Sequence, residues 1–416
     1  MQFLFVNSQR KNLLMTIPCI LILWGLAGIQ ASRAETPSVE EMWETIQQQQ
    51  KLIAELKARL DDTDQRVTAN EAKVEEATEE VEAAAEAFET AQTSMRGSSW
   101  ADRTTIGGYG ELHYNNQEGD DEVDFHRFIL YFGHEFTENI RFFSELELEH
   151  ALAGEGKLGE VELEQAWIEA DITDHHRLRV GLDILPVGLV SYNHEPNTFY
   201  GVERPEVEVR IIPSTWWEAG IGLNGELAPG WNYDAVLHSG LSTTTNIRSG
   251  RQKVSEANAD HPAVTARLRY TGIPGLEVGG SFQYQSDITA GIADNSATLF
   301  EGHVDWKHRT GLGLRALYTR WDLDKVLSIA GDDTQYGYYI EPAYRFPLGF
   351  ISGEVGVFAR WSELDYGNTK EEERIGFGIN YWPIDQVAFK FDWINIDDVD
   401  ADTSADTFNL GLAYQF

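Results

Sequence analysis

The chain has 416 residues, of which 42% are apolar, 12% aromatic and 24% charged, and its formal net charge is −36. This composition excludes a disordered chain and allows one large domain or two ordinary ones. The acidic balance excludes a nucleic-acid-binding protein, which needs a basic face.

The first 34 residues have the plan of a secretory signal peptide. Arg10 and Lys11 precede an apolar run from 13 to 29, and Ala31 and Ala34 follow it. We expect cleavage after one of these two alanines; a retained membrane anchor is the alternative. The single cysteine, Cys19, lies in this segment, so the mature chain is expected to hold no disulfide and no cysteine-bound metal.

Residues 35–96 carry a heptad repeat. One set of apolar positions returns every seven residues, and a second set, three residues later, is mostly small or polar. A period of seven requires a partner helix wound left-handedly against the first, and so polar a helix is marginal alone. We expect a coiled coil about 85 Å long in the periplasm; a lone solvated helix is the alternative. The first set comprises Val39, Ile46, Ile53, Leu60, Val67, Val74, Val81, Phe88 and Met95.

Beyond a short hinge at 97–102, apolar and polar residues alternate to the end of the chain. Phe300 and Val304, for example, oppose Glu301 and His303. Such alternation is typical of strands with one apolar face. The phase changes near Gln165, which indicates a bulge. We expect sixteen strands, at 103–115, 123–135, 140–151, 160–172, 177–185, 216–227, 231–240, 262–272, 275–286, 297–308, 311–322, 335–346, 350–363, 371–382, 386–396 and 405–416.

The connections between these strands alternate in length. Every second one is very short, such as TENI, TDHH, APG and PID, and the others are longer and polar. An even strand number with short turns at one end is typical of outer-membrane barrels, whereas a soluble sandwich has no reason to segregate its turns. The sequence therefore predicts an all-β protein, in which a 16-stranded antiparallel transmembrane β-barrel at 103–416 follows an N-terminal α-helical coiled coil.

The connection at 186–214 differs from the others. It is long and non-repeating, yet it contains Leu189, Val190, Tyr192 and Phe199. A loop of this length is usually functional or disordered, and its apolar side chains indicate that it packs against something. We predict that it folds into the barrel as a constriction loop; an external loop without a role in conduction is the alternative.

Several segments resemble trimeric outer-membrane porins, in particular the phosphate-selective porin O and P family. They are FHRFILYFGHEF, FFSELELEHA, VELEQAWIEADI, LRVGLDILPVGLVSYNHEP, VERPEV and GIGLNGEL. The resemblance covers roughly residues 103–416. It implies a homotrimer, a coiled coil ahead of the barrel, and recognition of the aromatic C-terminal Phe416 by the barrel assembly machinery. The loop departs from the family's clustered Arg and Lys, so phosphate or anion selectivity is an alternative only.

The sequence offers two sets of candidate channel residues. Carboxylate rings favour cations and guanidinium rings favour anions, and the loop is the more acidic of the two sets. We hypothesise that the loop carboxylates face Arg127, Arg141 and neighbouring wall arginines, with a weak cation preference; ion pairs that only brace the wall are the alternative. The constriction set is Glu195, Glu203, Arg204, Glu206, Glu208 and Arg210. The lumen-wall set is Arg127, Arg141, Glu145, Glu147, Arg267, Arg269 and Arg315.

These features predict an outer-membrane porin for passive diffusion of ions or small polar solutes. A tether that links the outer membrane to peptidoglycan through the coiled coil is the alternative. An enzyme is not expected, because no G-x-S-x-G or H-E-x-x-H motif is present. No cofactor and no metal site are expected. The expected partners are two further copies of the chain, outer-membrane lipid, lipopolysaccharide and the barrel assembly machinery.

Overall fold

The computed structural model describes residues 100–416, apart from 118–119, 328–332, 350 and 367–370, and six residues between 43 and 57. The chain divides into two units, Met1–Gly97 and Ser98–Phe416. The expected signal peptide at 1–34 and coiled coil at 35–96 lie outside the described residues, except that those six are helical and exposed. Among the described helices, none is long and apolar enough to cross a membrane.

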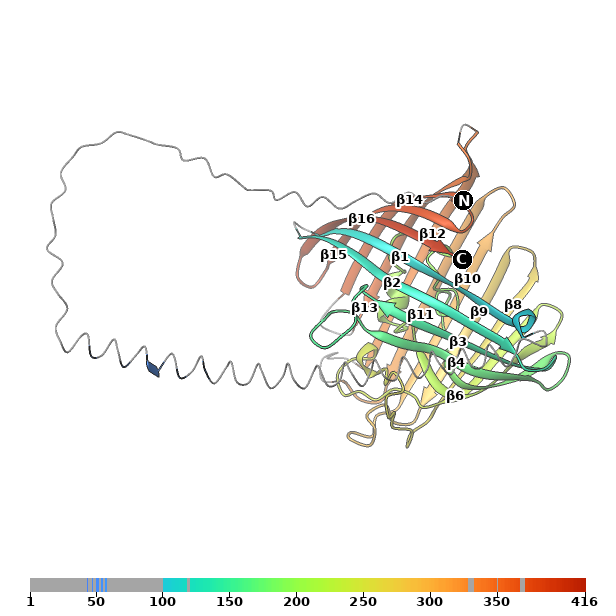
Figure 1. The fold of residues 1–416 in the computed structure, drawn as a ribbon, viewed down its shortest axis with the longest axis horizontal. Helices are drawn as coiled ribbons and strands as arrows, with labels where there is room; N and C mark the ends of the chain where they lie inside the picture. Colours follow the sequence, from blue (N-terminus) through green and yellow to red (C-terminus); the bar gives the residue numbers. More distant parts are fainter. Residues whose placement is uncertain are drawn as a thin grey trace, which may run out of the picture. The chain divides into compact units, whose positions relative to one another are not determined.

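The second unit is a closed barrel of sixteen antiparallel strands (Figure 1). The strands are β1 (Thr104–Gln117), β2 (Asp120–Glu135), β3 (Ile140–Glu149), β4 (Val161–Asp171), β5 (His176–Ile184), β6 (Trp217–Ala228), β7 (Trp231–His238), β8 (Ala263–Ile273), β9 (Leu276–Gln285), β10 (Ala297–Lys307), β11 (Leu312–Leu323), β12 (Thr334–Pro347), β13 (Glu354–Asp365), β14 (Glu371–Ile384), β15 (Val387–Asp398) and β16 (Thr403–Gln415). Each pairs with its neighbours in sequence, and β1 also pairs with β16, so no sheet edge is left open. The predicted barrel is confirmed. The largest shift in a boundary is at β13, which begins at Glu354 rather than at 350.

The two faces of the barrel differ in polarity. Phe300 is 50% exposed and Leu268 is 43% exposed on the outer face, whereas Glu301 and Arg315 are buried inside. Apolar side chains outside and polar side chains inside suit a barrel with lipid around it and water within it. A sandwich, the other fold that alternation allows, is excluded by the closed strand order.

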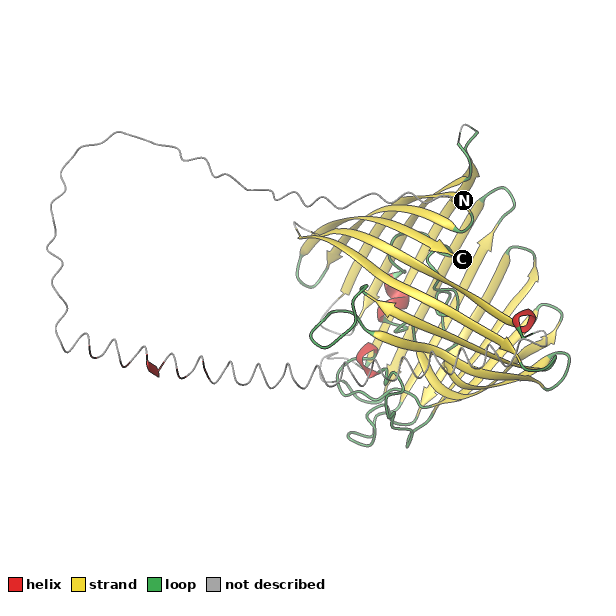
Figure 2. Ribbon diagram, in the orientation of Figure 1, coloured by secondary structure: helices red, strands yellow, loops and turns green. Residues whose placement is uncertain are grey.

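The connections at one end of the barrel are short, whereas the longest loops lie at the other end (Figure 2). The chain reverses through two residues at 229–230, 274–275 and 385–386, but takes many more between β5 and β6 and between β7 and β8. The latter loop contains the 3₁₀ helix η2 (Arg248–Gly250), and a second, η1 (Ala101–Arg103), precedes β1. In outer-membrane barrels the short turns are periplasmic. We therefore call the space inside the barrel at the short-turn, periplasmic end the lower vestibule and the space at the long-loop end the upper vestibule.

A β-bulge in β4 confirms the predicted phase change. Gln165 pairs with Glu145, but Leu163 pairs with Leu146, so Glu164 is an extra residue in the ladder. Glu164 and Gln165 are consequently both buried inside the barrel. Bulges often re-aim a side chain beside a functional site, and here the bulge adds a carboxylate to the inner wall.

A second bulge lies in β2. Arg127 pairs with Glu111, and Asp124 pairs with His113. Between these two pairs β2 contains two residues and β1 contains one, so β2 has one extra residue. The bulge brings His126 to the inner face, where its ring stacks on the ring of His113 with 4.8 Å between centroids. Adjacent residues of a regular strand point to opposite faces, so His126 and Arg127 share the interior only because of this bulge.

The chain between β5 and β6, residues 185–216, runs through the inside of the barrel. It is referred to below as the inner loop. Its side chains and backbone contact inward-facing residues of β1, β2, β3, β4, β9, β11, β12, β13 and β15. It contains one short helix, α2 (Glu206–Arg210). The loop crosses the lumen rather than lining one side of it.

Candidate functional site

An apolar cluster holds the base of the inner loop against one side of the barrel. Val187, Leu189, Ile211 and Ile212 are buried, and the Trp321 indole N–H donates to the backbone carbonyl of Ile211 at 2.8 Å. Burial of each such side chain stabilises by about 1.5–3 kcal/mol. The wall contributes Leu299, Leu317, Trp321, Leu323 and Leu364 to the cluster. This part of the lumen is therefore filled by a core.

Glu208 joins the two limbs of the inner loop. Its Oε2 accepts the backbone N–H groups of Leu189 and Val190, both at 2.7 Å, and its Oε1 accepts the Tyr339 hydroxyl of β12 at 2.7 Å. The side chain is fully buried, and burial raises the pKa of this carboxyl above its ordinary value, although the three donors oppose that rise. Glu208 therefore fixes the loop's fold and its place on the wall.

His194 anchors the loop on the opposite side. Its Nε2 lies 3.2 Å from Glu145 and 3.3 Å from Glu164, and Arg127 donates to its backbone carbonyl at 2.8 Å. Burial alone would lower the pKa of His194, but the two carboxylates outweigh it and raise that pKa to about 10. The bulge at Glu164 is what makes this double ion pair possible, because it places a second carboxylate on the inner face beside Glu145.

The tip of the inner loop is held by its backbone. Gly201 has φ +84°, and a Cβ there would lie 3.2 Å from the Asp392 carboxylate, so glycine is required at this close approach. Four wall side chains form hydrogen bonds with the backbone of the tip. Three of them donate to its carbonyls: Arg315 to Thr198 at 2.7 Å, Arg360 to Tyr200 at 2.8 Å and Lys390 to Gly201 at 2.8 Å. The fourth, Asp392, accepts the backbone N–H of Val202 at 2.6 Å. Charged wall groups thus grip main-chain atoms of the tip rather than its side chains.

Two loop carboxylates do point towards open space in the barrel. The Glu203 carboxylate lies 2.9 Å from His113 Nδ1, within ion-pair distance. Glu206 pairs with Arg210 on the same helix and lies 3.6 Å from Arg374 of β14. Both line a cavity of about 410 Å³ towards the long-loop end.

Three arginines near this cavity bond no described carboxylate. Arg204 donates to the Thr215 hydroxyl at 2.7 Å, Arg248 donates to the Ser214 carbonyl at 2.8 Å, and Arg251 donates to the Thr215 carbonyl at 2.5 Å. Burial, together with the positive charges of Arg251 and Arg204, lowers the pKa of Arg248. Three guanidinium groups that repel one another form a concentrated positive patch, which we call the arginine cluster.

Open space lies on both sides of the inner loop. Towards the long loops, the 410 Å³ cavity shares His126, Arg204 and Arg248 with a neighbouring cavity of about 290 Å³. Towards the short turns lie two further cavities, of about 540 Å³ and 260 Å³. The tip of the inner loop, from Thr198 to Val202, separates the 410 Å³ cavity from the 540 Å³ cavity.

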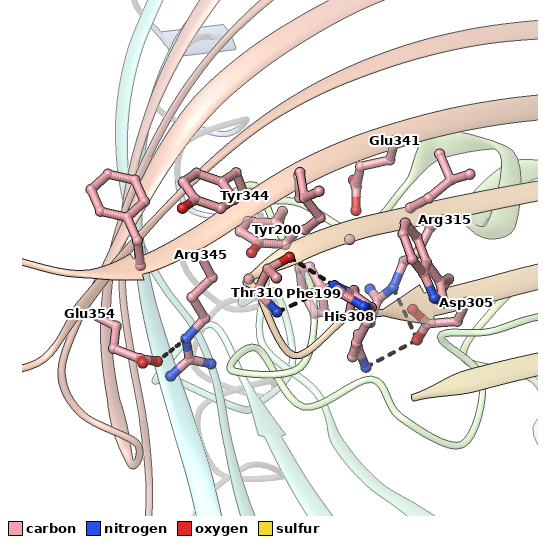
Figure 3. Close-up of a pocket in the computed structure, with 18 of the residues that line it drawn as sticks. Phe199, Tyr200, Asp305, His308, Thr310, Arg315, Glu341, Tyr344, Arg345 and Glu354 are labelled. Carbon is pink, nitrogen blue, oxygen red and sulfur yellow. Dashed lines mark hydrogen bonds and ion pairs between the residues drawn. The ribbon is translucent and has the colours of Figure 1, made fainter. Parts of the chain in front are cut away.

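Figure 3 shows the cavity on the periplasmic side of the tip. Phe199 and Tyr200 of the inner loop lie beside His308 and Thr310 of the turn between β10 and β11. Further ion pairs line this space, including Arg345 with Glu354 at 2.5 Å and Arg315 with Asp305 at 3.4 Å. The lower vestibule thus has both signs of charge along its wall.

The structure corrects the predicted pairing between loop carboxylates and wall arginines. Glu208 is buried in the loop's own fold and does not face the opening. Arg141 lies near the short turns, where it pairs with Glu169 and Asp171. Arg127 reaches the loop through the His194 carbonyl, not through a carboxylate.

The other predicted residues fall inside the barrel with different partners. Among the described residues, the Glu195 carboxylate accepts a hydrogen bond only from the Tyr131 hydroxyl, at 3.4 Å. Arg267 pairs with Asp234 at 2.9 Å, and Arg269 lies 3.5 Å from Glu277. Glu147 is buried on the inner wall beside Glu164. The remaining predicted residues, Glu203, Arg204, Glu206, Arg210, Glu145 and Arg315, have the contacts given above.

Sequence reasoning missed several residues of the site. Arg248 and Arg251 lie in the loop between β7 and β8, whose segment RSGRQK is the one strongly basic stretch in otherwise acidic long loops. That contrast was a usable signal. The roles of His194, Lys390 and Asp392 depend on contacts across the barrel and left no local signal.

The barrel is similar in fold to solved outer-membrane porins. It is similar in fold to an anion-selective porin from Comamonas acidovorans, with a TM-score of 0.54, 12% identity, and coverage of 75% of this chain and 99% of that one. It is also similar to Salmonella typhi OmpF in complex with daunomycin, with a TM-score of 0.54, 12% identity, and coverage of 75% and 97%. At such low identity, the likeness shows the fold alone.

No family model matches the chain. The chain is 33% identical to an uncharacterised protein of Aquifex aeolicus (strain VF5), over 75% of this chain and 80% of that protein. It therefore belongs to the same family as that protein. The similar structures support the porin fold that the resemblance implies, and the phosphate-selective porin O and P family itself stays a prediction.

Proposed function

We propose that the protein is an outer-membrane porin, in which ions and small polar solutes diffuse passively past the inner loop. The observation that carries the proposal is the inner loop itself, which crosses a closed barrel with a polar interior and has cavities on both sides. A narrowed, water-filled barrel in a membrane works as a size-limited channel. The porin fold of the similar structures favours a channel over an enzyme.

The upper vestibule has charges of opposite sign on opposite sides. Glu147, Glu149 and Glu162 lie on the β3–β4 wall, whereas the arginine cluster lies on the inner loop and the β7–β8 loop. A solute with separated charges can align between two such walls. Because the chain as a whole is strongly acidic, with a net charge of −36, we propose a weak preference for cations. Reversal potentials in a salt gradient across a planar bilayer test this preference, and a clear anion preference would contradict it.

An anion-selective channel is the second candidate, because the arginine cluster is not neutralised by any described carboxylate. We predict that Arg248→Ala shifts the reversal potential further towards cation selectivity, since it removes one of three clustered positive charges from the pathway. Arg320→Ala is the matched control: it removes an arginine that pairs with Asp322 and is next to the buried Trp321, so it points outward. An equal shift in both variants would contradict a role for the cluster.

We further propose a homotrimer in the bacterial outer membrane, with the N-terminal segment in the periplasm. The Vibrio cholerae barrel described as a trimer form has a TM-score of 0.50 to this chain and 11% identity, and the heptads at 35–96 require a partner helix. The mass of the detergent-solubilised protein tests the trimer. Deleting residues 39–95 tests the tether: a channel with unchanged conductance but a loosened cell envelope would assign peptidoglycan attachment to that segment.

A further inference from the structure

Two histidines and an aspartate converge on the wall of the upper vestibule. Asp124 and His126 belong to β2, and His150 directly follows β3. The Nδ1 atoms of both histidines approach one oxygen, Asp124 Oδ2, at 3.2 Å from His126 and 2.8 Å from His150. The backbone N–H of His150 donates to the His126 carbonyl at 3.0 Å, which fixes the two residues side by side.

We propose that Asp124, His126 and His150 bind a late first-row divalent metal ion such as Zn²⁺, Ni²⁺ or Cu²⁺. Ligand atoms about 2.0–2.1 Å from a common ion, at tetrahedral or square angles, are about 2.8–3.4 Å apart. The observed spacings are close to that range, and the ligand atoms of all three residues lie within 4.8 Å of one another. Two imidazoles with one carboxylate suit these metals, whereas Mg²⁺ and Ca²⁺ prefer oxygen ligands alone.

The surroundings of the triad favour a cation. No described lysine or arginine lies within ion-pair distance of Asp124, and the same holds for Glu147 and Glu149 nearby. Of the cations that line the adjoining cavity, Arg127 pairs with Glu111, and Lys253 pairs with Glu160 and Glu162. The arginine cluster lines the same cavity but bonds Ser214 and Thr215 rather than the triad. Among the described residues, no lysine or arginine is therefore in direct contact with Asp124.

The site is open to solutes. His126 and His150 line the 290 Å³ cavity, together with Glu147, Glu149 and Glu162, which form a second cluster of close carboxylates. A metal held by three protein ligands keeps a coordination position for water or a solute. The β2 bulge is essential to this arrangement, because it is what brings His126 to the inner face.

The test is a calorimetric titration of the full-length, tag-free protein in detergent with Zn²⁺ alone. We expect binding of Zn²⁺ that weakens at least tenfold in His150→Ala and in His126→Ala. His261→Ala is the matched control: this histidine lies in another long loop, 4.0 Å from Asp287, and its removal should leave the affinity unchanged. Mg²⁺ in excess should not displace Zn²⁺.

A second measurement covers the case in which a variant folds poorly. With Cu²⁺ bound to the wild-type protein, electron paramagnetic resonance should show two coordinated imidazole nitrogens. Absence of binding, equal affinity in the triad variants and the wild type, displacement by Mg²⁺, or a copper spectrum without nitrogen coupling would each overturn the proposal. The site does not depend on conduction, so a barrel that binds Zn²⁺ but conducts nothing would contradict the proposed function alone.

Discussion

The His194→Ala variant is expected to lose the docked position of the inner loop and to conduct in larger, noisier steps than the wild type. The substitution leaves the buried carboxylates of Glu145 and Glu164 facing each other without their shared cation. Removing one partner of a buried ion pair costs about 3–5 kcal/mol. His194 lies outside the strands of the closed barrel, so the barrel should still form in the variant. Single-channel recording in a planar bilayer then measures the effect on the loop.

Neutralising the two carboxylates is the matched control. The triple variant His194→Ala with Glu145→Gln and Glu164→Gln has no stranded buried charge, so its steps should return part of the way towards wild-type size. If the single and triple variants conduct alike, then the ion pairs of His194 do not hold the loop.

The same anchor gives a pH dependence with a definite sign. The pKa of His194 is raised in the folded protein from 6.5 to about 10, so its stabilising contribution is complete below about pH 6.5 and is lost as the pH rises towards 10. Channel noise should therefore increase over that interval in the wild type and stay level in His194→Ala.

The Glu208→Ala variant is expected to unfold the inner loop at its base. The substitution leaves the buried N–H groups of Leu189 and Val190 and the hydroxyl of Tyr339 without a hydrogen-bond acceptor. Each buried donor without a partner costs about 1–3 kcal/mol, so the docked loop should be destabilised by at least about 3 kcal/mol. The measurement is proteolysis of the inner loop in the folded barrel, which should become fast in this variant.

Two further variants separate this role from a simple loss of charge. Tyr339→Phe removes one of the three donors and should cost about 1 kcal/mol. Glu195→Gln removes a carboxylate from the same loop whose described contact is one long bond to Tyr131, so it should leave the cleavage rate unchanged. Fast cleavage in Glu195→Gln, or slow cleavage in Glu208→Ala, would contradict the account.

The barrel was predictable because its signals are local. Alternation within each strand and turn length between strands are written in consecutive residues, and chain order then fixes which strands are neighbours. The bulge at Glu164 was visible for the same reason, since it breaks the alternation at Gln165. Inward-facing residues such as Arg127 and Glu145 followed directly from the strand phase.

The partners inside the barrel were not predictable from the sequence. His194 meets Glu145 and Glu164 only because the inner loop descends at a particular angle, and no periodicity encodes that path. Glu208 was predicted as a pore carboxylate. Its neighbours Val207 and Ile211 pack in the apolar cluster, so the short helix lies against the wall and Glu208 is buried. Charge on a loop shows that a residue is polar, whereas its function depends on which way the loop turns.

Whether the inner loop narrows an open channel is tested most directly by the single-channel conductance of the intact protein and of a variant that lacks the tip of the inner loop. In the variant, residues 193–202 are replaced by a short glycine–serine linker, so the barrel strands are untouched. We expect small, stable conductance steps for the intact protein and clearly larger steps for the variant, because the tip that separates the upper and lower cavities is gone. An intact protein that does not conduct, or a variant with unchanged steps, would contradict it.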